Sequence, residues 1–263
     1  MAQVVPVTNN ALNSITRQAK YEPFDLQVAR GQITGHIPVY IFGYSATVGS
    51  SALGPCWEGL TLSGGYYVYP SSAVQMTVVS TSASDNTTRS IVINGLDANY
   101  KIITEILALN GTTPVTTVNS YFRINSVSMF NSTNTGVITL ANGGTTYAQI
   151  NAGIGQTQMS IYSVPAGYTF YLTYIQADAS VGFTSSNYML FAEYNKFNVN
   201  GSVTLAGQAT FVQAYNQPFG IPVAHPEKTD IQYVIRANSG SPFTADIFAG
   251  GVLIKNTADG ANT

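Results

Sequence analysis

Few side chains in this sequence of 263 residues could act as nucleophiles, bases or metal ligands. The two histidines, His36 and His225, lie far apart in the chain, and the single cysteine, Cys56, stands in the string GPCWEG. Zinc sites are recognised by ligands at i, i+4 or short-loop spacing, and a nucleophilic cysteine needs a histidine base. Because the sequence shows neither arrangement, we expect two turn histidines, a small buried cysteine and no metal site.

Two glycine-containing strings fall short of the motifs that they partly match. Gly43-Tyr44-Ser45 is followed by Thr47 where a nucleophile elbow has its second glycine. Gly153-Ile154-Gly155 lacks the third glycine and the following helix of a dinucleotide-binding loop. Neither string predicts a catalytic nucleophile or a bound cofactor.

The acidic residues are the remaining candidates for catalysis. Glycoside hydrolases use two carboxylates, which can come from distant strands, and Glu105 and Glu193 lie within predicted strands. Asp97, Glu227 and Asp230 lie in predicted turns, where acids more often cap or brace the backbone. We therefore expect no catalytic residue and no cofactor, hence no enzyme, with a polysaccharide-degrading enzyme as a third alternative.

An aromatic run, Gly65-Tyr66-Tyr67-Val68-Tyr69-Pro70, lies close to Trp57, the only tryptophan. A flat platform of such rings stacks on sugars, whereas tyrosines are also favoured at protein interfaces, where one end is apolar and the other wet. In an extended strand, Tyr67 and Tyr69 share one face and Tyr66 takes the other. Trp57, Tyr66, Tyr67 and Tyr69 are therefore candidates for an interface or core, with a glycan platform as the alternative.

The chain is poor in charge. Only 8% of its residues are charged, with a net charge of -2, whereas soluble globular chains carry about 25%. A hydrophobic content of 45% excludes disorder, and the singly scattered cations exclude a nucleic-acid footprint. So neutral a surface is either buried in an assembly or belongs to a neutral adhesive or structural element.

The sequence also bears on where the protein is made. No run of about 18 apolar residues occurs, so no membrane-spanning helix is predicted. The string MAQVVPVTNN has neither the basic region nor the long apolar region of a signal peptide. A lone cysteine fits cytoplasmic synthesis, and we expect a protein made without export.

Turn residues and short apolar runs predict an all-β protein. Four Asn-Gly pairs, which begin at Asn94, Asn110, Asn142 and Asn200, are hairpin candidates. Strands are predicted at residues 74–81, 90–93, 100–109, 121–130, 145–150, 159–164, 168–177, 188–199, 203–215, 230–237 and 243–255. The run 100–109 also fits a helical stripe, but its β-branched residues favour a strand. Ten or more strands without long helices between them predict antiparallel sandwiches or jelly rolls.

The chain divides by composition into an arm and two β halves. Residues 1–24 form the predicted N-terminal arm, with a modest helical pattern at 11–20. The Asn- and Gly-rich segment 131–144 is the predicted boundary between a β-rich half at 25–130 and a β-sandwich half at 145–263. A single large sandwich with a long loop at 131–144 is the alternative.

Several strings resemble a family of virion structural proteins of tailed bacteriophages of aquatic bacteria, including cyanophages and marine phages. They are FDLQVARGQITGH (24–36), IFGY (41–44), YPSSAVQMTVVSTSASD (69–85), INGLDANYKIITEILALNGTTPVTTVNSYFRIN (93–125), YAQINAGIGQTQMSIYSVPAGYTFYL (147–172) and PFGIPVAHPEKTDIQ (218–232). The resemblance spans nearly the whole chain after residue 24. It implies a virion component and brings no catalytic residues with it.

The sequence and the resemblance together predict a non-enzymatic virion protein. The first hypothesis is a capsid decoration or cement protein that binds the major capsid protein as a symmetric homo-oligomer, with a trimer favoured. The arm at residues 1–22 would grip the lattice. The alternative is a tail, neck or fibre component that recognises a host glycan, through the tyrosines at 66–69 or the loop near Asn131. We expect no nucleic-acid or membrane partner.

Overall fold

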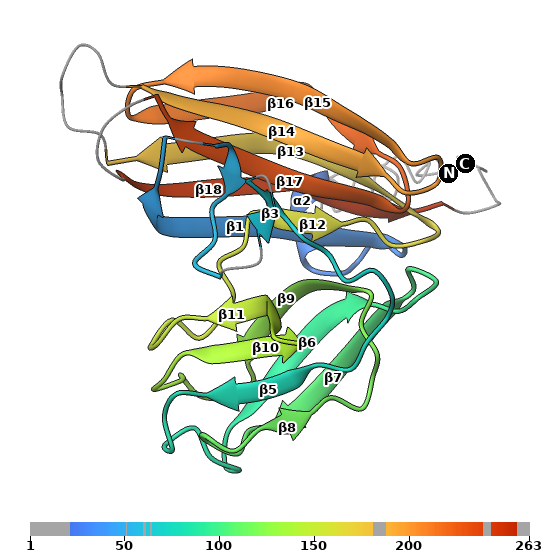
Figure 1. The fold of residues 1–263 in the computed structure, drawn as a ribbon. Coiled ribbons are helices and arrows are strands. Elements are labelled where there is room, and N and C mark those ends of the chain that lie inside the picture. Colours follow the sequence, from blue (N-terminus) through green and yellow to red (C-terminus); the bar gives the residue numbers. More distant parts are fainter. Residues whose placement is uncertain are drawn as a thin grey trace, which may run out of the picture.

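The computed structural model describes residues 22–50, 52–59, 62–63, 65–180, 188–238 and 243–256. These residues form two stacked groups of antiparallel strands (Figure 1). We call them the long-strand unit, made of the described residues within 36–55 and 161–255, and the short-strand unit, made of residues 77–150. The predicted all-β, antiparallel sandwich fold is confirmed. No helix in the described part of the chain has the length and apolar character needed to span a bilayer.

The long-strand unit is a jelly roll of two packed sheets. Sheet I has the order β1 (His36–Val48), β18 (Phe243–Lys255), β13 (Tyr168–Ala179) and β16 (Ala214–His225). Sheet II has the order β12 (Ile161–Ser163), β17 (Thr229–Ala237), β14 (Met189–Phe197) and β15 (Ser202–Phe211), and β2 (Gly54–Pro55) also pairs with β17. Counted along the chain without β2, sheet I takes strands one, eight, three and six, and sheet II takes two, seven, four and five. That interleaving of two Greek keys defines a jelly roll.

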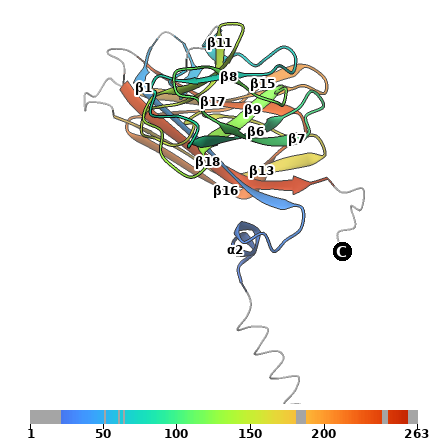
Figure 2. The same cartoon turned by 90° about the horizontal axis from the view of Figure 1, so that it is seen from below.

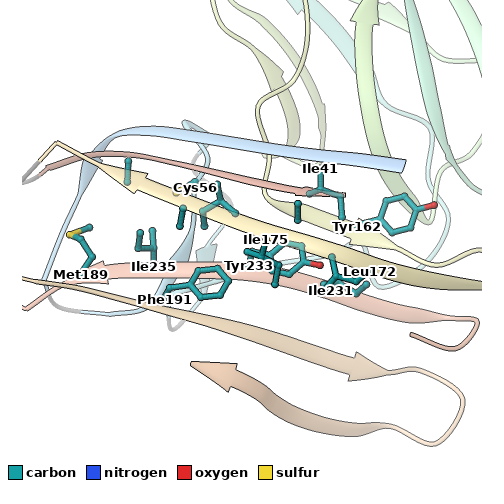
Figure 3. Close-up of a cluster of buried hydrophobic side chains, with 14 of the residues drawn as sticks. Ile41, Cys56, Tyr162, Leu172, Ile175, Met189, Phe191, Ile231, Tyr233 and Ile235 are labelled. Carbon is teal, nitrogen blue, oxygen red and sulfur yellow. The ribbon is translucent and has the colours of Figure 1, made fainter. Parts of the chain in front are cut away.

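The jelly-roll core lies between the two sheets because alternate residues of each strand point inward. In β1, Val39 and Ile41 are buried whereas Tyr40 is exposed. Figure 3 shows Ile41 and Ile175 of sheet I on one side of this core and Phe191 and Tyr233 of sheet II on the other. Each fully buried aliphatic or aromatic side chain of this kind contributes about 1.5–3 kcal/mol.

The short-strand unit is a second, smaller sandwich inserted between the first and second jelly-roll strands. One sheet has the order β11 (Thr145–Ile150), β10 (Ile138–Asn142), β5 (Thr77–Ser80) and β8 (Val115–Thr116); the other has β7 (Ile102–Ala108), β6 (Ser90–Leu96) and β9 (Arg123–Met129). Both sheets contribute to one core, which includes Val78, Ile93, Val127 and Leu140. The hairpin of β3 (Leu62–Ser63) and β4 (Tyr66–Tyr67) lies on the connection between the units.

The predicted boundary at 131–144 is wrong. Residues 138–142 of that segment form β10, which pairs with β5 and with β11. The halves 25–130 and 145–263 do not match the sheets either, because β1 pairs with β18 across the whole chain. Turn residues indicate only where a strand ends. They therefore could not reveal that the short-strand unit is inserted between two strands of the jelly roll.

Three local predictions also need correction. Asn94-Gly95 lies inside β6, and the chain turns at residues 97–101, where Asp97 Oδ1 accepts hydrogen bonds from the backbone of Asn99 and Lys101. The predicted strand 203–215 is two strands, β15 and β16. A short helix, α2 (Phe24–Ala29), lies where strands were expected to begin, and it stands away from the sheets near the start of β1 (Figure 2). The helical pattern at 11–20 lies outside the described residues.

Candidate functional site

The predicted aromatic candidates lie at the junction between the two units. Trp57 and Tyr67 are buried, with 5% and 4% exposure, and their rings meet edge to face at 5.2 Å. Tyr67 also meets Tyr69 edge to face at 4.7 Å and donates a hydrogen bond from Oη to the Tyr147 carbonyl at 2.7 Å. Trp57 and Tyr67 are therefore buried at this junction, with no exposed flat face for a sugar, and the half-buried Tyr69 packs against the edge of Tyr67.

Tyr66 takes the opposite face, as the alternation predicts. Its ring stacks on Tyr194 at 4.3 Å. The two rings border a depression that also includes Lys196 and Asn198. Tyr66 and the half-buried Tyr69 both line this depression, and Tyr66 has a stacked partner from the jelly roll.

A buried ion pair joins the two units at the same junction. Arg123 of β9 donates Nε to Asp230 Oδ1 at 2.8 Å and Nη2 to Oδ2 at 2.9 Å, and both side chains are at most 3% exposed. Ser163 and Asn198 donate further hydrogen bonds to the Asp230 carboxylate. Burial alone would lower the pKa of Arg123, but the hydrogen bond and charge of Asp230 raise it. Asp230 was placed in a turn from the sequence; it is the second residue of β17.

Aromatic rings surround the Arg123 guanidinium. It lies 4.5 Å from the ring centroid of Tyr69, 5.3 Å from that of Tyr100 and 4.0 Å from that of Phe122. Cation–π contacts of this kind stabilise a desolvated arginine. Arg123 is thus held on every side by structural contacts, so this network fixes the two units together and leaves no free reactive group.

The residues that could have done nucleophilic chemistry are also in structural positions. Cys56 is fully buried, and burial raises the pKa of its thiol, which disfavours the nucleophilic thiolate. His36 starts β1 and lies edge to face with Phe24. His225 ends β16, buried against Phe170 and 3.5 Å from Glu193. Among the described residues, no three His, Cys, Asp or Glu side chains come together to hold a metal ion.

The acids that were candidates for catalysis mostly brace the backbone. Glu105 accepts hydrogen bonds from the backbone of Val118 and Asn119 and from the hydroxyl of Tyr121. Glu227 accepts one from the backbone of Gly167. Glu193 accepts one from Asn195, and burial raises its pKa. These contacts match the bracing role expected for turn acids and extend it to Glu105.

One pair of acidic residues was not predicted from the sequence. Asp178 of β13 lies directly opposite Asp246 of β18 on the outer face of sheet I. Burial, followed by the charge of Asp178, raises the pKa of Asp246. Directly opposed side chains in antiparallel strands have Cβ atoms about 4.5–5.5 Å apart. Sequence could not reveal the pair, because its register depends on a pairing between residues far apart in the chain.

Aromatic side chains continue along that outer face. Phe248 follows Asp246 by two residues in β18 and stacks on Tyr40 of β1, with 6.2 Å between centroids and 3° between planes. Phe42 and Tyr174 also contact Phe248. A cleft of about 300 Å³ opens where these rings approach β9 of the short-strand unit.

A long charge-free part of the jelly roll is residues 199–224, which we call the neutral edge. Of its 26 residues, 21 are exposed and none is charged. It includes β15 and nearly all of β16, each of which is the outermost strand of its sheet. The jelly roll therefore presents two adjoining sheet edges on one side, as Figure 1 shows for β15 and β16.

Comparisons with known proteins give no family for this chain. No family model and no curated protein matches it. A structure titled as that of infectious bursal disease virus Gx strain is 10% identical, with 87% of this chain and 73% of that chain covered and a TM-score of 0.24. The Gt strain structure is 12% identical over 92% and 89%, with a TM-score of 0.11. TM-scores this low establish neither a family nor a function, and none of these comparisons reproduces the phage resemblance.

Proposed function

We propose that the chain is a non-enzymatic structural protein of a virion, namely a capsid decoration or cement protein that works as a symmetric homo-oligomer. The observation that carries this proposal is the neutral edge, a surface of 26 residues without charge. The jelly roll is a fold of viral capsid proteins and of lectins, which supports the proposal by analogy of fold alone. The resemblance of the sequence to phage virion proteins points the same way.

The neutral edge has the features of a covered surface. In β15, residues 202–208 are exposed on both faces of the strand, including Val203 and Leu205, each about half exposed. Monomeric proteins protect such edges with charge, proline or a covering element. β16 has Pro218 and Pro222, which cannot donate a backbone hydrogen bond, but β15 has neither proline nor charge. β15 is therefore the edge that is open to pairing.

The occupant that fits this edge is a second copy of the same chain. An uncharged surface does not attract a charged partner electrostatically. A second copy of this chain would bring an equally uncharged surface. A stable interface uses about 20–30 residues on each side, a range that includes the 21 exposed residues of the neutral edge. Pairing of β15 between copies would also satisfy backbone groups that the free edge leaves to water.

The first test of self-association is the substitution Leu205→Lys, studied by sedimentation velocity. A lysine at the centre of a neutral interface should weaken association at least about tenfold, which is ~1.4 kcal/mol. Val118→Lys is the matched control, because Val118 is 81% exposed on the short-strand unit. A wild-type protein that sediments as a monomer at high concentration, or equal association of both variants, would refute the assignment of this edge.

The virion assignment needs purified particles. Quantitative mass spectrometry should give copies of this chain per copy of the major capsid protein. On the order of hundreds of copies per particle would support decoration of the icosahedral lattice, whereas about 5–18 would favour a vertex, neck, tail or fibre position, by symmetry. Absence from the particles would overturn the virion proposal itself.

The second candidate function is host-glycan recognition by a tail, neck or fibre component. The glycan platform first expected at Trp57, Tyr67 and Tyr69 does not favour it, because those rings meet inside the molecule. The cleft beside Tyr40 and Phe248 does favour it, since it joins the exposed ring of Tyr40 and the half-buried ring of Phe248 to uncharged polar groups.

A further inference from the structure

The cleft on the outer face of sheet I combines two walls of different chemistry. One wall consists of the aromatic rings of Tyr40, Phe42 and Phe248. The other comes from β9 and the segment after β11, and it includes Ser126, Ser128, Gln156 and Thr157. Figure 1 shows β1 facing β9 across the junction of the two units, so the cleft exists only because the short-strand unit is docked there.

The aromatic wall is accessible and flat enough to receive a ring. The side chain of Tyr40 is 65% exposed, and its ring is almost parallel to that of Phe248. Tyr174 packs against Phe248 from the next strand and supports it from β13. Aromatic faces carry a negative potential that attracts polarised C–H groups, such as those on the apolar face of a sugar ring.

The polar wall has hydrogen-bonding capacity to spare. Among the described residues, the side chains of Ser128 and Gln156 form no hydrogen bond with other protein groups. A hydroxyl and an amide can each donate and accept, which suits a ligand that carries many hydroxyl groups. The described lining contains no Lys, Arg, Asp or Glu, so a phosphate or another charged group has no counter-charge there.

The acid pair extends the same face beyond the cleft. Asp246 lies two residues from Phe248 along β18, about 7 Å at the rise of an extended strand. Gln176 of β13 lies directly opposite Phe248 and donates a hydrogen bond to Asp178. Carboxylates and amides accept hydrogen bonds from hydroxyl groups, so a chain of sugars that leaves the cleft along β18 would meet suitable acceptors.

We propose that this cleft binds a neutral carbohydrate, with a sugar ring stacked on Tyr40 and Phe248 and its hydroxyl groups bound by Ser128, Gln156 and the Asp178–Asp246 pair. The inference rests on the second candidate function, glycan recognition, and names the residues and the class of ligand. It does not depend on the assembly role. The site uses residues of β1, β13, β18 and β9 together with Gln156, whereas the neutral edge lies on β15 and β16.

The test uses the full chain on a printed array of glucans, mannans and galactans, with sulfated and uronate glycans as charged comparisons. The best neutral binder is then titrated, as a soluble oligosaccharide, into three proteins by calorimetry. Tyr40→Ala should weaken binding by about tenfold or more because it removes the exposed ring. Tyr188→Ala is the matched control, since Tyr188 is 45% exposed and lies outside the cleft lining.

Each outcome decides the proposal. Binding of neutral glycans that is lost in Tyr40→Ala and kept in Tyr188→Ala supports the site. No binding to any neutral glycan, binding only to charged glycans, or equal binding by both variants overturns it. Because Leu205→Lys reports on self-association alone, failure of the cleft proposal and failure of the assembly proposal are distinguished.

Discussion

The two units of this protein handle their buried polar groups differently. In the short-strand unit, Asp85 is fully buried and receives hydrogen bonds from Ser80, Arg89 and the backbone of Thr135 and Gly136. Among the described residues of the jelly roll, three buried polar atoms have no hydrogen-bond partner: Asn195 Oδ1, His225 Nε2 and Tyr233 Oη. The core of the short-strand unit has one such atom in the side chains that pack into it, Trp57 Nε1. Unpaired buried polar groups reduce stability, so we expect the short-strand unit to be the better-satisfied of the two.

The same contrast holds at the surface. The neutral edge, the aromatic wall and the acid pair all belong to the jelly roll, whereas the short-strand unit and the segment after β11 contribute only the polar wall of the cleft. The difference teaches that the short-strand unit is a well-bonded support, docked to a larger unit that carries the surfaces proposed here for recognition.

The largest expected effect comes from breaking the connection between the units. Asp230→Ala leaves the Arg123 guanidinium buried without its counter-charge, which costs about 3–5 kcal/mol. If the units differ in stability as their polar groups imply, calorimetry should then resolve two thermal transitions where the wild type has one.

The control is the exposed ion pair between Glu22 and Arg30. Arg30→Ala should change the free energy of unfolding by no more than about 1 kcal/mol, because exposed pairs contribute little. Equal, small losses from both substitutions would show that the Arg123–Asp230 pair does not hold the units together.

The second prediction contrasts the two units in acid. Burial lowers the pKa of His225 from 6.5 to about 4. Between those pH values His225 binds a proton in the unfolded chain but not in the folded jelly roll. The free energy of unfolding therefore falls as the pH drops from 6.5 to 4. Glu193 on β14, whose raised pKa acts in the opposite direction, offsets part of this loss; Tyr215 and Tyr233, which also lie near this pair, stay neutral there.

In the short-strand unit, Asp85 makes stability depend on pH over a different, more acidic range. Burial alone would raise its pKa, but its hydrogen bonds and Arg89 lower it below the usual 3.8. Its contribution is present above pH 3.8 and is lost only below that value. Urea unfolding of Asp230→Ala at several pH values should therefore show the jelly-roll transition weaken first, and His225→Gln should flatten that dependence. Parallel loss in both transitions from pH 6.5 would contradict the assignment.

The sequence predicts the features of this fold that depend on neighbouring residues, namely the positions of most strands and the fold class. Alternation and turn residues located most strands, and the lack of long helices gave the sandwich class. The order of the strands was beyond reach, because His36 pairs with Ile254 and residues 77–80 pair with 138–141. Those pairings result from the burial of whole sheet faces, and no local sequence pattern indicates them. The boundary at 131–144 was wrong for this reason.

The candidate site divides in the same way. The pattern of Tyr66, Tyr67 and Tyr69 correctly predicted which rings share a face, and an interface or core was one of its two readings. Which residues stay exposed depends on the docking of the second unit, which covers Trp57 and Tyr67. The cleft and the Asp178–Asp246 pair arise from register between distant strands, so only the three-dimensional structure brings them together.

The smallest expected effect comes from the same substitution, Tyr→Phe, made at two buried tyrosines. It tests the contrast in how their hydroxyl groups are hydrogen-bonded. Tyr67→Phe removes a hydroxyl that is bonded to the Tyr147 carbonyl, and the free energy of unfolding should fall by about 1 kcal/mol. Tyr233→Phe removes a buried hydroxyl without a partner, so the free energy should rise by about 1 kcal/mol, since an unsatisfied group no longer has to be desolvated. Both rings keep their packing, which makes the hydroxyl the only variable. Chemical denaturation of the two variants should therefore give shifts of opposite sign. A loss of stability in Tyr233→Phe would mean that its hydroxyl is satisfied in solution, which would contradict the contrast between the two units at this residue.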